Sequence, residues 1–315
     1  MAAGALNAIP EAHRETVQAA LAACFGAMPI YAITPITAGA SAGAILRIEA
    51  GGRRYLLRVE GPRSPLRYPH QYISLRMAAE QGLAPKVHYV DETAGVVVTD
   101  FIETQPLHTY PGGMPALVTA MGELLRRLHE TPVVPSFVPY PEIVARLFAH
   151  VRRTGLFAPG VLDPHLDHLE RLRAAYAWDP AHAVSCHNDC LPANILFDGK
   201  RLWLIDWESA YPNDPLVDVA IQLDNLARSP ELAGVLLRVW LGRTPDDTIL
   251  RRLAQARALN RLYYAGVLLS ASATRPRATP DDSLAVSTDE PMTGHMRGKL
   301  YLRGFLTGET VPAIA

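Results

Sequence analysis

A short polar stretch in the second half of the chain constrains its fold more than any other part of the sequence. It contains His187, Asp189 and Asn194 in the order H-x-D-x-x-x-x-N, and Asp206 follows behind an apolar strand. A carboxylate such as Asp189 can orient a hydroxyl group and receive its proton, whereas an amide oxygen and a second carboxylate are ligands that Mg²⁺ prefers. We therefore predict Asp189 as the catalytic residue, and Asn194 and Asp206 as magnesium ligands.

The spacing of this stretch is that of the kinase catalytic loop, where phosphoryl transfer depends on positioned oxygen ligands and on a carboxylate beside the acceptor. The alternative is a loop whose polar residues only complete turns. That alternative does not explain why chemically distinct groups follow one another in kinase order and at kinase spacing. The stretch therefore favours a kinase that uses ATP and Mg²⁺.

The first third of the chain predicts a nucleotide-binding lobe. A glycine-rich loop at residues 37–43 precedes two predicted strands, at residues 45–48 and 55–59. The backbone N–H groups of such a loop can approach phosphate oxygens closely, although a hairpin turn explains the glycines equally well. The order of loop, strand and basic strand residue favours nucleotide binding. The residues expected to contact the nucleotide are Gly39, Ser41, Gly43 and Arg58.

Further elements complete this lobe. Helices are predicted at residues 10–27 and 69–82, and two more strands at residues 85–90 and 96–102. The last strand leads into a predicted hinge, where the backbone of Asp100 and Ile102 is expected to bind adenine. Residues 1–103 therefore form the predicted N-terminal lobe, a β-sheet with helices.

Residues 104–315 are expected to form a larger, mostly helical lobe with the catalytic loop, the metal ligands and the acceptor site. A short hairpin is predicted at residues 196–205. Apolar residues recur at helical spacing in most of the remainder. The predicted helices cover residues 116–129, 141–154, 163–177, 216–228, 231–242, 246–273 and 292–306. A β-rich lobe followed by a helical lobe is an α+β, bilobal, protein-kinase-like fold.

The catalytic region also resembles a known family. The segments C-H-N-D-C-L-P-A-N-I-L at residues 186–196, I-D-W-E at 205–208 and N-D-P at 213–215 are similar to the choline/ethanolamine kinase, LicA-like branch of the aminoglycoside phosphotransferase superfamily. The resemblance implies phosphorylation of a small-molecule hydroxyl, most often that of choline or a related amino alcohol. It also implies that His187 and Asp218 hold the catalytic loop and that Arg58 contacts the ATP phosphates.

Two residues depart from the family pattern. Ala42 stands where many members have Asn, and Gln71 stands near the position of the helix Glu that pairs with the strand cation. A hydrogen bond between Gln71 and Arg58 would orient the cation less firmly than an ion pair. Reduced or lost activity, as in a nucleotide-binding pseudokinase with a regulatory role, is therefore an alternative, although the intact Asp189 opposes it.

A choline-like acceptor requires a carboxylate and aromatic faces. The predicted acceptor residues are Glu208, Asp224, Trp207 and Tyr211, with Trp240, Tyr263 and Tyr264 as further aromatic candidates. Core packing or local pairing explains each of them as well. Thiamine, a thioribose, a sugar or an aminoglycoside are alternative acceptors, and the last would use acids such as those at residues 281, 282, 289 and 290.

The composition of the chain limits its binding partners, its compartment and the chemistry of its cysteines. Of the 315 residues 49% are hydrophobic, and the net charge of −1 gives no sign of a nucleic-acid or membrane partner. The first residues do not read as a signal peptide. The three cysteines, Cys24, Cys186 and Cys190, are too few and too poorly spaced for a disulfide framework or a zinc site, so buried thiols are expected. We expect a cytoplasmic enzyme; the sequence leaves its oligomeric state open.

Overall fold

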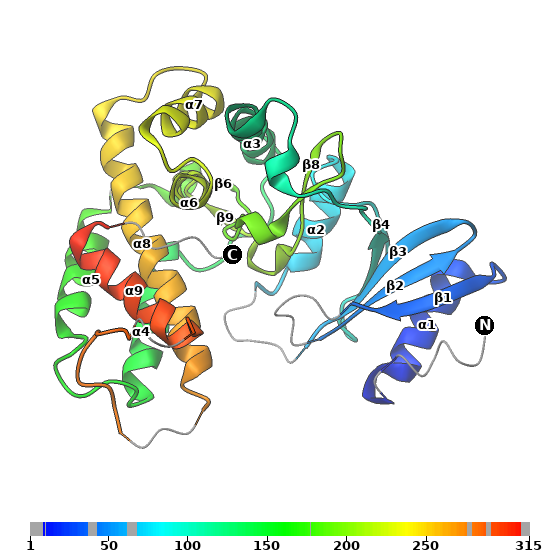
Figure 1. Ribbon diagram of the computed structural model, residues 1–315, viewed down its shortest axis with the longest axis horizontal. Helices are drawn as coiled ribbons and strands as arrows, with labels where there is room; N and C mark the ends of the chain where they lie inside the picture. The colour runs from blue at the N-terminus through cyan, green and yellow to red at the C-terminus, as the bar shows by residue number, and fades with distance from the viewer. Residues whose placement is uncertain are drawn as a thin grey trace. The chain divides into compact units, whose positions relative to one another are not determined.

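The structure is a computed structural model, and Figure 1 shows its course. It describes residues 9, 11–36, 43–61, 68–176, 178–275, 279–287 and 291–309. The chain forms two compact units. The first contains Met1–Gly113 together with Asn194–Ala210, and the second contains Met114–Ala193 together with Tyr211–Ala315. The predicted boundary at residue 104 stays a prediction.

The first unit is built on a five-stranded antiparallel sheet with the strand order β1-β2-β3-β5-β4. Its strands are β1 (Ile30–Pro35), β2 (Ala44–Ala50), β3 (Arg53–Val59), β4 (Val87–Asp91) and β5 (Val96–Asp100). Apolar residues alternate along β2 and β3, because successive side chains of a strand point to opposite faces. The inward residues form one core with helix α1 (Arg14–Phe25), which Figure 1 shows against the sheet.

The same unit contains helix α2 (Gln71–Glu80) and a hairpin of β7 (Ile195–Phe197) and β8 (Leu202–Leu204). The hairpin is fixed to the chain after α2, because the Leu204 N–H donates to the Leu83 carbonyl at 2.9 Å. A short 3-10 helix, η6 (Trp207–Ser209), follows and contacts α2. The segment that carries Asn194 and Asp206 therefore belongs to the first unit, although it lies far along the sequence.

The second unit is mostly helical. Its helices are α3 (Gly113–His129), α4 (Tyr140–Arg153), α5 (Asp163–Ala175), α6 (Leu216–Asn225), α7 (Pro230–Leu241), α8 (Asp247–Ser272) and α9 (Gly294–Thr307). Helix α8 is central and packs against α4, α6 and α9 (Figure 1). Glycines permit the close approach: a Cβ on Gly266 would lie 2.5 Å from Leu147, and one on Gly298 would lie 2.8 Å from Leu269. The strands β6 (Val184–Ser185) and β9 (Pro212–Asn213) pair beside the catalytic loop.

These elements confirm the α+β, protein-kinase-like fold, and each predicted helix is present within a few residues of its expected ends. Strand β1 was not anticipated, because Pro35 and the exposed Tyr31 give it no regular apolar alternation. The predicted phosphate-loop residues Gly39 and Ser41, and the departure at Ala42, lie outside the described residues. Across the described ranges, no helix combines the length and the apolar character that a membrane span requires.

Candidate active site

The catalytic loop of the second unit is held by one buried carboxylate, that of Asp218 on α6. It accepts hydrogen bonds from the backbone N–H groups of His187 at 2.8 Å and Asn188 at 2.7 Å. Burial raises the pKa of Asp218, but the His129 and His187 contacts lower it by more, so its net pKa lies below the ordinary value. The predicted anchoring role of Asp218 is confirmed by these contacts.

His129 on α3 completes the anchor. Its Nε2 lies 3.2 Å from the Asp218 carboxylate, and the indole N–H of Trp240 donates to its Nδ1 at 2.9 Å. Because Nδ1 accepts, Nε2 carries the ring proton and donates it to Asp218. The half-buried Trp240 thus fixes the tautomer of His129.

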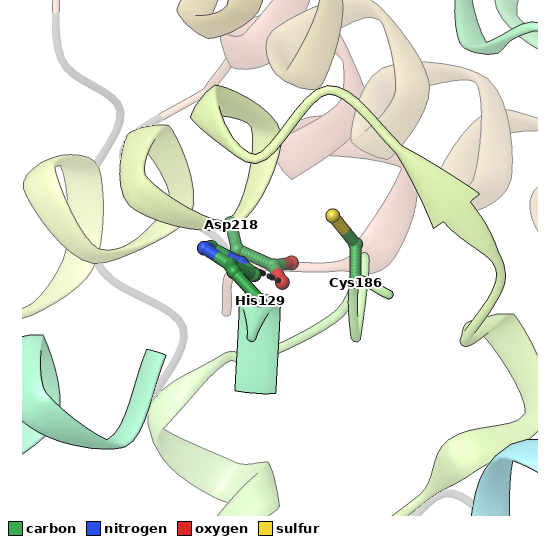
Figure 2. Close-up of side chains that lie close together, drawn as sticks. All are labelled: His129, Cys186 and Asp218. Carbon is green, nitrogen blue, oxygen red and sulfur yellow. Dashed lines mark hydrogen bonds and ion pairs between the residues drawn. The ribbon is translucent and has the colours of Figure 1, made fainter. Parts of the chain in front are cut away.

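Figure 2 shows the side chains of His129, Cys186 and Asp218 close together. Their potential ligand atoms lie within 4.8 Å of one another. These atoms are already engaged: the thiol of Cys186 donates to the Asn213 carbonyl, and Asp218 holds the loop. Burial raises the pKa of the Cys186 and Cys190 thiols well above the ordinary value, which keeps both sulfurs protonated. The cluster anchors the loop and contains one neutral thiol, that of Cys186; Cys186 and Cys190 are both buried, as expected.

The residue after His187 adopts an unusual backbone conformation. Asn188 has a φ of 60°, in the left-handed region that Asn tolerates better than most residues. Its side chain is fixed on both sides, since Nδ2 donates to the Tyr211 carbonyl at 3.0 Å and Oδ1 accepts from Asn213 at 2.8 Å. A strained residue held by its surroundings is typical of an active-site loop.

Asp214 supports the segment that holds Asn188. Its carboxylate is fully buried and accepts from Tyr176 at 3.1 Å, from Arg252 at 2.7 Å and from the Leu216 N–H at 3.0 Å. The last of these bonds lies at the start of α6, the helix that carries Asp218. The N-D-P segment therefore connects α6, α8 and the catalytic loop.

Asp189, the predicted catalytic residue, follows directly in this loop. Its backbone N–H lies 3.3 Å from Nδ1 of the buried His187, which supports the predicted loop-holding role of that histidine. The hydroxyl of Tyr264 donates to Asp189 Oδ1 at 3.1 Å. Burial, and then the negative charge of Asp189, raise the pKa of Tyr264 well above its ordinary value, so the tyrosine remains a donor.

The predicted magnesium ligands, Asn194 and Asp206, lie together in the first unit at one end of the β7–β8 hairpin. The Ile205 N–H donates to the Asn194 carbonyl at 3.0 Å, which brings the two backbones side by side. Asp206 has a φ of 65°, another left-handed residue that is not glycine. An amide and a carboxylate are oxygen ligands suited to Mg²⁺, so the donor set fits that ion.

Arg58 of β3 lies against this pair. Its guanidinium contacts Asp206 at 2.8 Å and Glu208 at 3.3 Å. Burial lowers the pKa of Arg58, but Asp206 and Glu208 raise it by more, so the cation is retained. One cation against two carboxylates leaves this cluster with a net negative charge, which favours a divalent cation.

Among the residues that the structure describes, Gln71, which stands where the family has a Glu, does not form the expected hydrogen bond with Arg58. It pairs with Glu60 instead. Gln71 Nε2 donates to both oxygens of Glu60, at 2.7 and 3.0 Å, and Tyr72 donates to the same carboxylate at 2.7 Å. Glu60 directly follows β3 and adds to the negative field around Arg58. An amide at position 71 is therefore matched to a carboxylate partner, whereas a Glu there would oppose it.

The remaining residues that were predicted to bind the nucleotide lie in and beside the sheet. A Cβ on Gly43 would lie 1.9 Å from the Val59 carbonyl oxygen, so the close strand approach itself requires glycine. Asp100 is engaged, since its N–H donates to the Lys86 carbonyl and its carboxylate lies 2.8 Å from His88 Nε2. Within the described ranges, no hydrogen bond occupies the backbone of Ile102, which leaves these groups available to adenine.

The predicted acceptor residues are separated. Glu208 pairs with Arg58, and Trp207 is buried in the first unit with its indole N–H on the Leu204 carbonyl at 3.1 Å. Tyr211 is buried in the second unit. Asp224 lines a pocket of the second unit together with Tyr264, the donor to Asp189. Of the predicted set, Asp224 is thus the residue that shares a pocket with a partner of Asp189.

Sequence reasoning missed three residues of these sites. Glu60 has the spacing of an ordinary strand end, and Arg261 and Tyr301 lie on helices among apolar neighbours. A charged residue on the apolar face of a predicted helix was the available signal for Arg261, because arginine is rarely buried without a partner.

Known proteins and a family model resemble this chain. The model of the phosphotransferase enzyme family matches residues 32–256. The protein LicA of Haemophilus influenzae is 42% identical over 59 residues, a match that spans 19% of this chain and 22% of that protein.

Solved structures resemble the whole chain. The choline kinase LicA from Streptococcus pneumoniae is 15% identical with a TM-score of 0.67, over 95% of this chain and 100% of that one. A spectinomycin phosphotransferase in complex with ADP and spectinomycin is 14% identical with a TM-score of 0.60, over 92% and 93% of the two chains. These likenesses support the fold, and the family model covers well over half of the chain, which therefore belongs to the phosphotransferase enzyme family.

Proposed function

We propose that this protein is an ATP-dependent kinase that phosphorylates a hydroxyl group of a small molecule. The observation that carries the proposal is the anchored loop, in which Asp218 fixes the backbone of His187 and Asn188 and the next residue is Asp189. A carboxylate on a rigid loop is what a kinase needs to place an acceptor hydroxyl.

The roles of the residues follow from their chemistry. The new bond forms between the acceptor oxygen and the γ-phosphorus, the bond from that phosphorus to the β–γ bridging oxygen breaks, ADP leaves, and the hydroxyl proton passes to Asp189. Arg58 contributes positive charge to the phosphates. Asn194 and Asp206 would hold Mg²⁺, which when bound offsets the negative charge of the phosphate oxygens.

The acceptor that we propose is choline or a related amino alcohol. Two relatives named above are a LicA protein and a choline kinase of the LicA type. Asp224 and Tyr264 in one pocket supply the carboxylate and the aromatic ring that an amine requires. The likeness to a spectinomycin phosphotransferase favours a hydroxylated antibiotic as the second candidate.

The compartment and the cofactors belong to the same proposal. ATP and free thiols are both typical of the cytoplasm, and Cys24, Cys186 and Cys190 are free. We therefore infer a cytoplasmic enzyme that uses Mg-ATP.

The test combines binding with turnover. Mg-ATP at a hundred times its Kd should stabilise the wild type by about 2.7 kcal/mol, and Asp189→Asn should retain that stabilisation. ADP release in the presence of choline, ethanolamine, thiamine, sugars or aminoglycosides should disappear in the same variant. Binding without turnover on any acceptor would instead indicate a nucleotide-binding regulator and would refute the kinase.

A further inference from the structure

A small pocket in the second unit lies beside the predicted catalytic aspartate. Asp224, Arg261, Tyr264 and Tyr301 line it; the cavity itself is about 10 Å³, and it opens to solvent. Tyr264 connects it to the catalytic loop, because its hydroxyl donates to Asp189 Oδ1 at 3.1 Å. A molecule in this pocket therefore lies one side chain away from Asp189.

In the described chain, only one of the two carboxylate oxygens of Asp224 has contacts with arginine side chains. Arg257 donates to Asp224 Oδ1 from Nε at 2.8 Å and from a terminal nitrogen at 2.5 Å. The contact from Arg261, at 3.9 Å, also goes to Oδ1. Among the described residues, nothing donates to Oδ2 of Asp224, whose side chain is 17% exposed. The pocket thus offers one carboxylate oxygen to a hydrogen-bond donor.

Arg261 is a buried cation with few hydrogen-bond acceptors around it. The residue is 6% exposed, and its Nε has no hydrogen-bond partner. In the described part of the chain, its single ionic contact is the long one to Asp224. A guanidinium has five N–H donors, and a buried one without acceptors is costly, so an acceptor group supplied by a ligand would be strongly favoured.

The charges of the pocket define the ligand. The residues that line the pocket include one acid, Asp224, and one cation, Arg261. A purely cationic ligand would bring Arg261 no anionic partner. A ligand that carries a carboxylate besides its ammonium would place an anion on Arg261 and a cation on Asp224 Oδ2. Arginine binds planar carboxylates better than any other side chain, because its donors match their geometry.

We propose that the acceptor is an amino alcohol that also bears a carboxylate, a hydroxy amino acid, with Arg261 as the residue that selects the carboxylate. This inference rests on the proposed kinase function and narrows its acceptor class. Asp224 Oδ2 binds the ammonium group, and the acceptor hydroxyl is left for Asp189.

The experiment compares acceptors that differ only by a carboxylate on the carbon that bears the amine. Ethanolamine is paired with serine, and 3-aminopropan-1-ol with homoserine, and ADP release from Mg-ATP is measured for each. The wild type should favour the carboxylated member of at least one pair by about 10- to 100-fold in kcat/KM, the range of one or two charge-assisted hydrogen bonds. Arg261→Met should remove this preference mainly through KM.

The control variant is Arg251→Met, which removes an exposed arginine from the same helix. It should retain the wild-type preference. Binding of serine and homoserine by calorimetry provides a readout that does not depend on turnover, and it should weaken in Arg261→Met alone.

The outcomes separate the two proposals. Turnover of choline or ethanolamine with no gain from the carboxylate would overturn the acceptor class and leave the kinase standing. Carboxylate-dependent binding lost in Arg261→Met, without turnover of any acceptor, would support the pocket and refute the kinase. Equal binding by wild type and Arg261→Met would refute the role of Arg261.

Discussion

Replacing Asp218 by Asn tests whether one carboxylate holds the catalytic loop. The change keeps the shape of the side chain and removes its charge. Asp218 is fully buried and accepts two backbone N–H groups and the His129 ring N–H. An asparagine has one oxygen and one NH₂ group at this place, so its NH₂ group must face a donor that it cannot satisfy.

The size of the effect follows from these contacts. Losing one charge-assisted hydrogen bond costs about 1.5–3 kcal/mol, and the bonds that remain become neutral and weaker. Breaking a buried ionic set by removing one partner costs about 3–5 kcal/mol. We therefore expect Asp218→Asn to lower the free energy of unfolding by about 3–5 kcal/mol, and the folded fraction to lose most of its turnover because the loop no longer holds its left-handed residue.

Urea unfolding measures the first effect, with Asp247→Asn as the control. Asp247 is an exposed acid in the first turn of α8, where the same substitution should change stability by about 0.5 kcal/mol or less. The pH dependence has a definite sign. Because the native pKa of Asp218 is lowered despite its burial, its contribution is present above the unfolded value of about 3.9 and is lost as pH falls through the lower native value.

The difference between wild type and Asp218→Asn should thus be constant from about pH 5 to 7 and shrink below about pH 4. A variant within about 1 kcal/mol of the wild type at pH 7, with unchanged turnover, would refute the anchor.

Three further changes test other contacts. Tyr264→Phe should lower kcat about 5- to 20-fold with little change in the KM of ATP, because Asp189 loses an orienting hydrogen bond; an equal rise in both KM values would contradict this role. Gln71→Glu should destabilise the first unit by about 1–3 kcal/mol in thermal unfolding, since it places a second carboxylate against Glu60, and a more stable variant would disprove the pairing. Gly43→Ala should cost about 1–3 kcal/mol or more in the same assay, because its Cβ meets a backbone carbonyl, and an unchanged melting temperature would contradict the close approach.

The sequence predicts the helices and most strands because their apolar periodicity is often strong, as in α3 and α4. It also predicts the catalytic stretch, because H-x-D-x-x-x-x-N joins several chemical roles at a fixed spacing. The loop anchor of Asp218 followed from family resemblance, and its contacts with His187 and Asn188 confirm it.

Other features depend on contacts that no local pattern encodes. The pairing of Gln71 with Glu60 and the engagement of Glu208 by Arg58 connect residues on separate elements. The character of Arg261 depends on burial among α6, α8 and α9, and burial of a single arginine is set by tertiary packing. Contacts between polar residues on different helices and strands could therefore not be predicted from the sequence.

The central claim is transfer of the γ-phosphoryl group to an acceptor hydroxyl with Asp189 as the base. The most direct measurement is ³¹P NMR of the protein with Mg-ATP and the amino-alcohol and hydroxy-amino-acid acceptors. We predict a phosphomonoester resonance that grows in step with ADP and is absent with Asp189→Asn, although that variant still binds Mg-ATP. Release of inorganic phosphate alone, or ester formation at the wild-type rate by Asp189→Asn, would contradict the account.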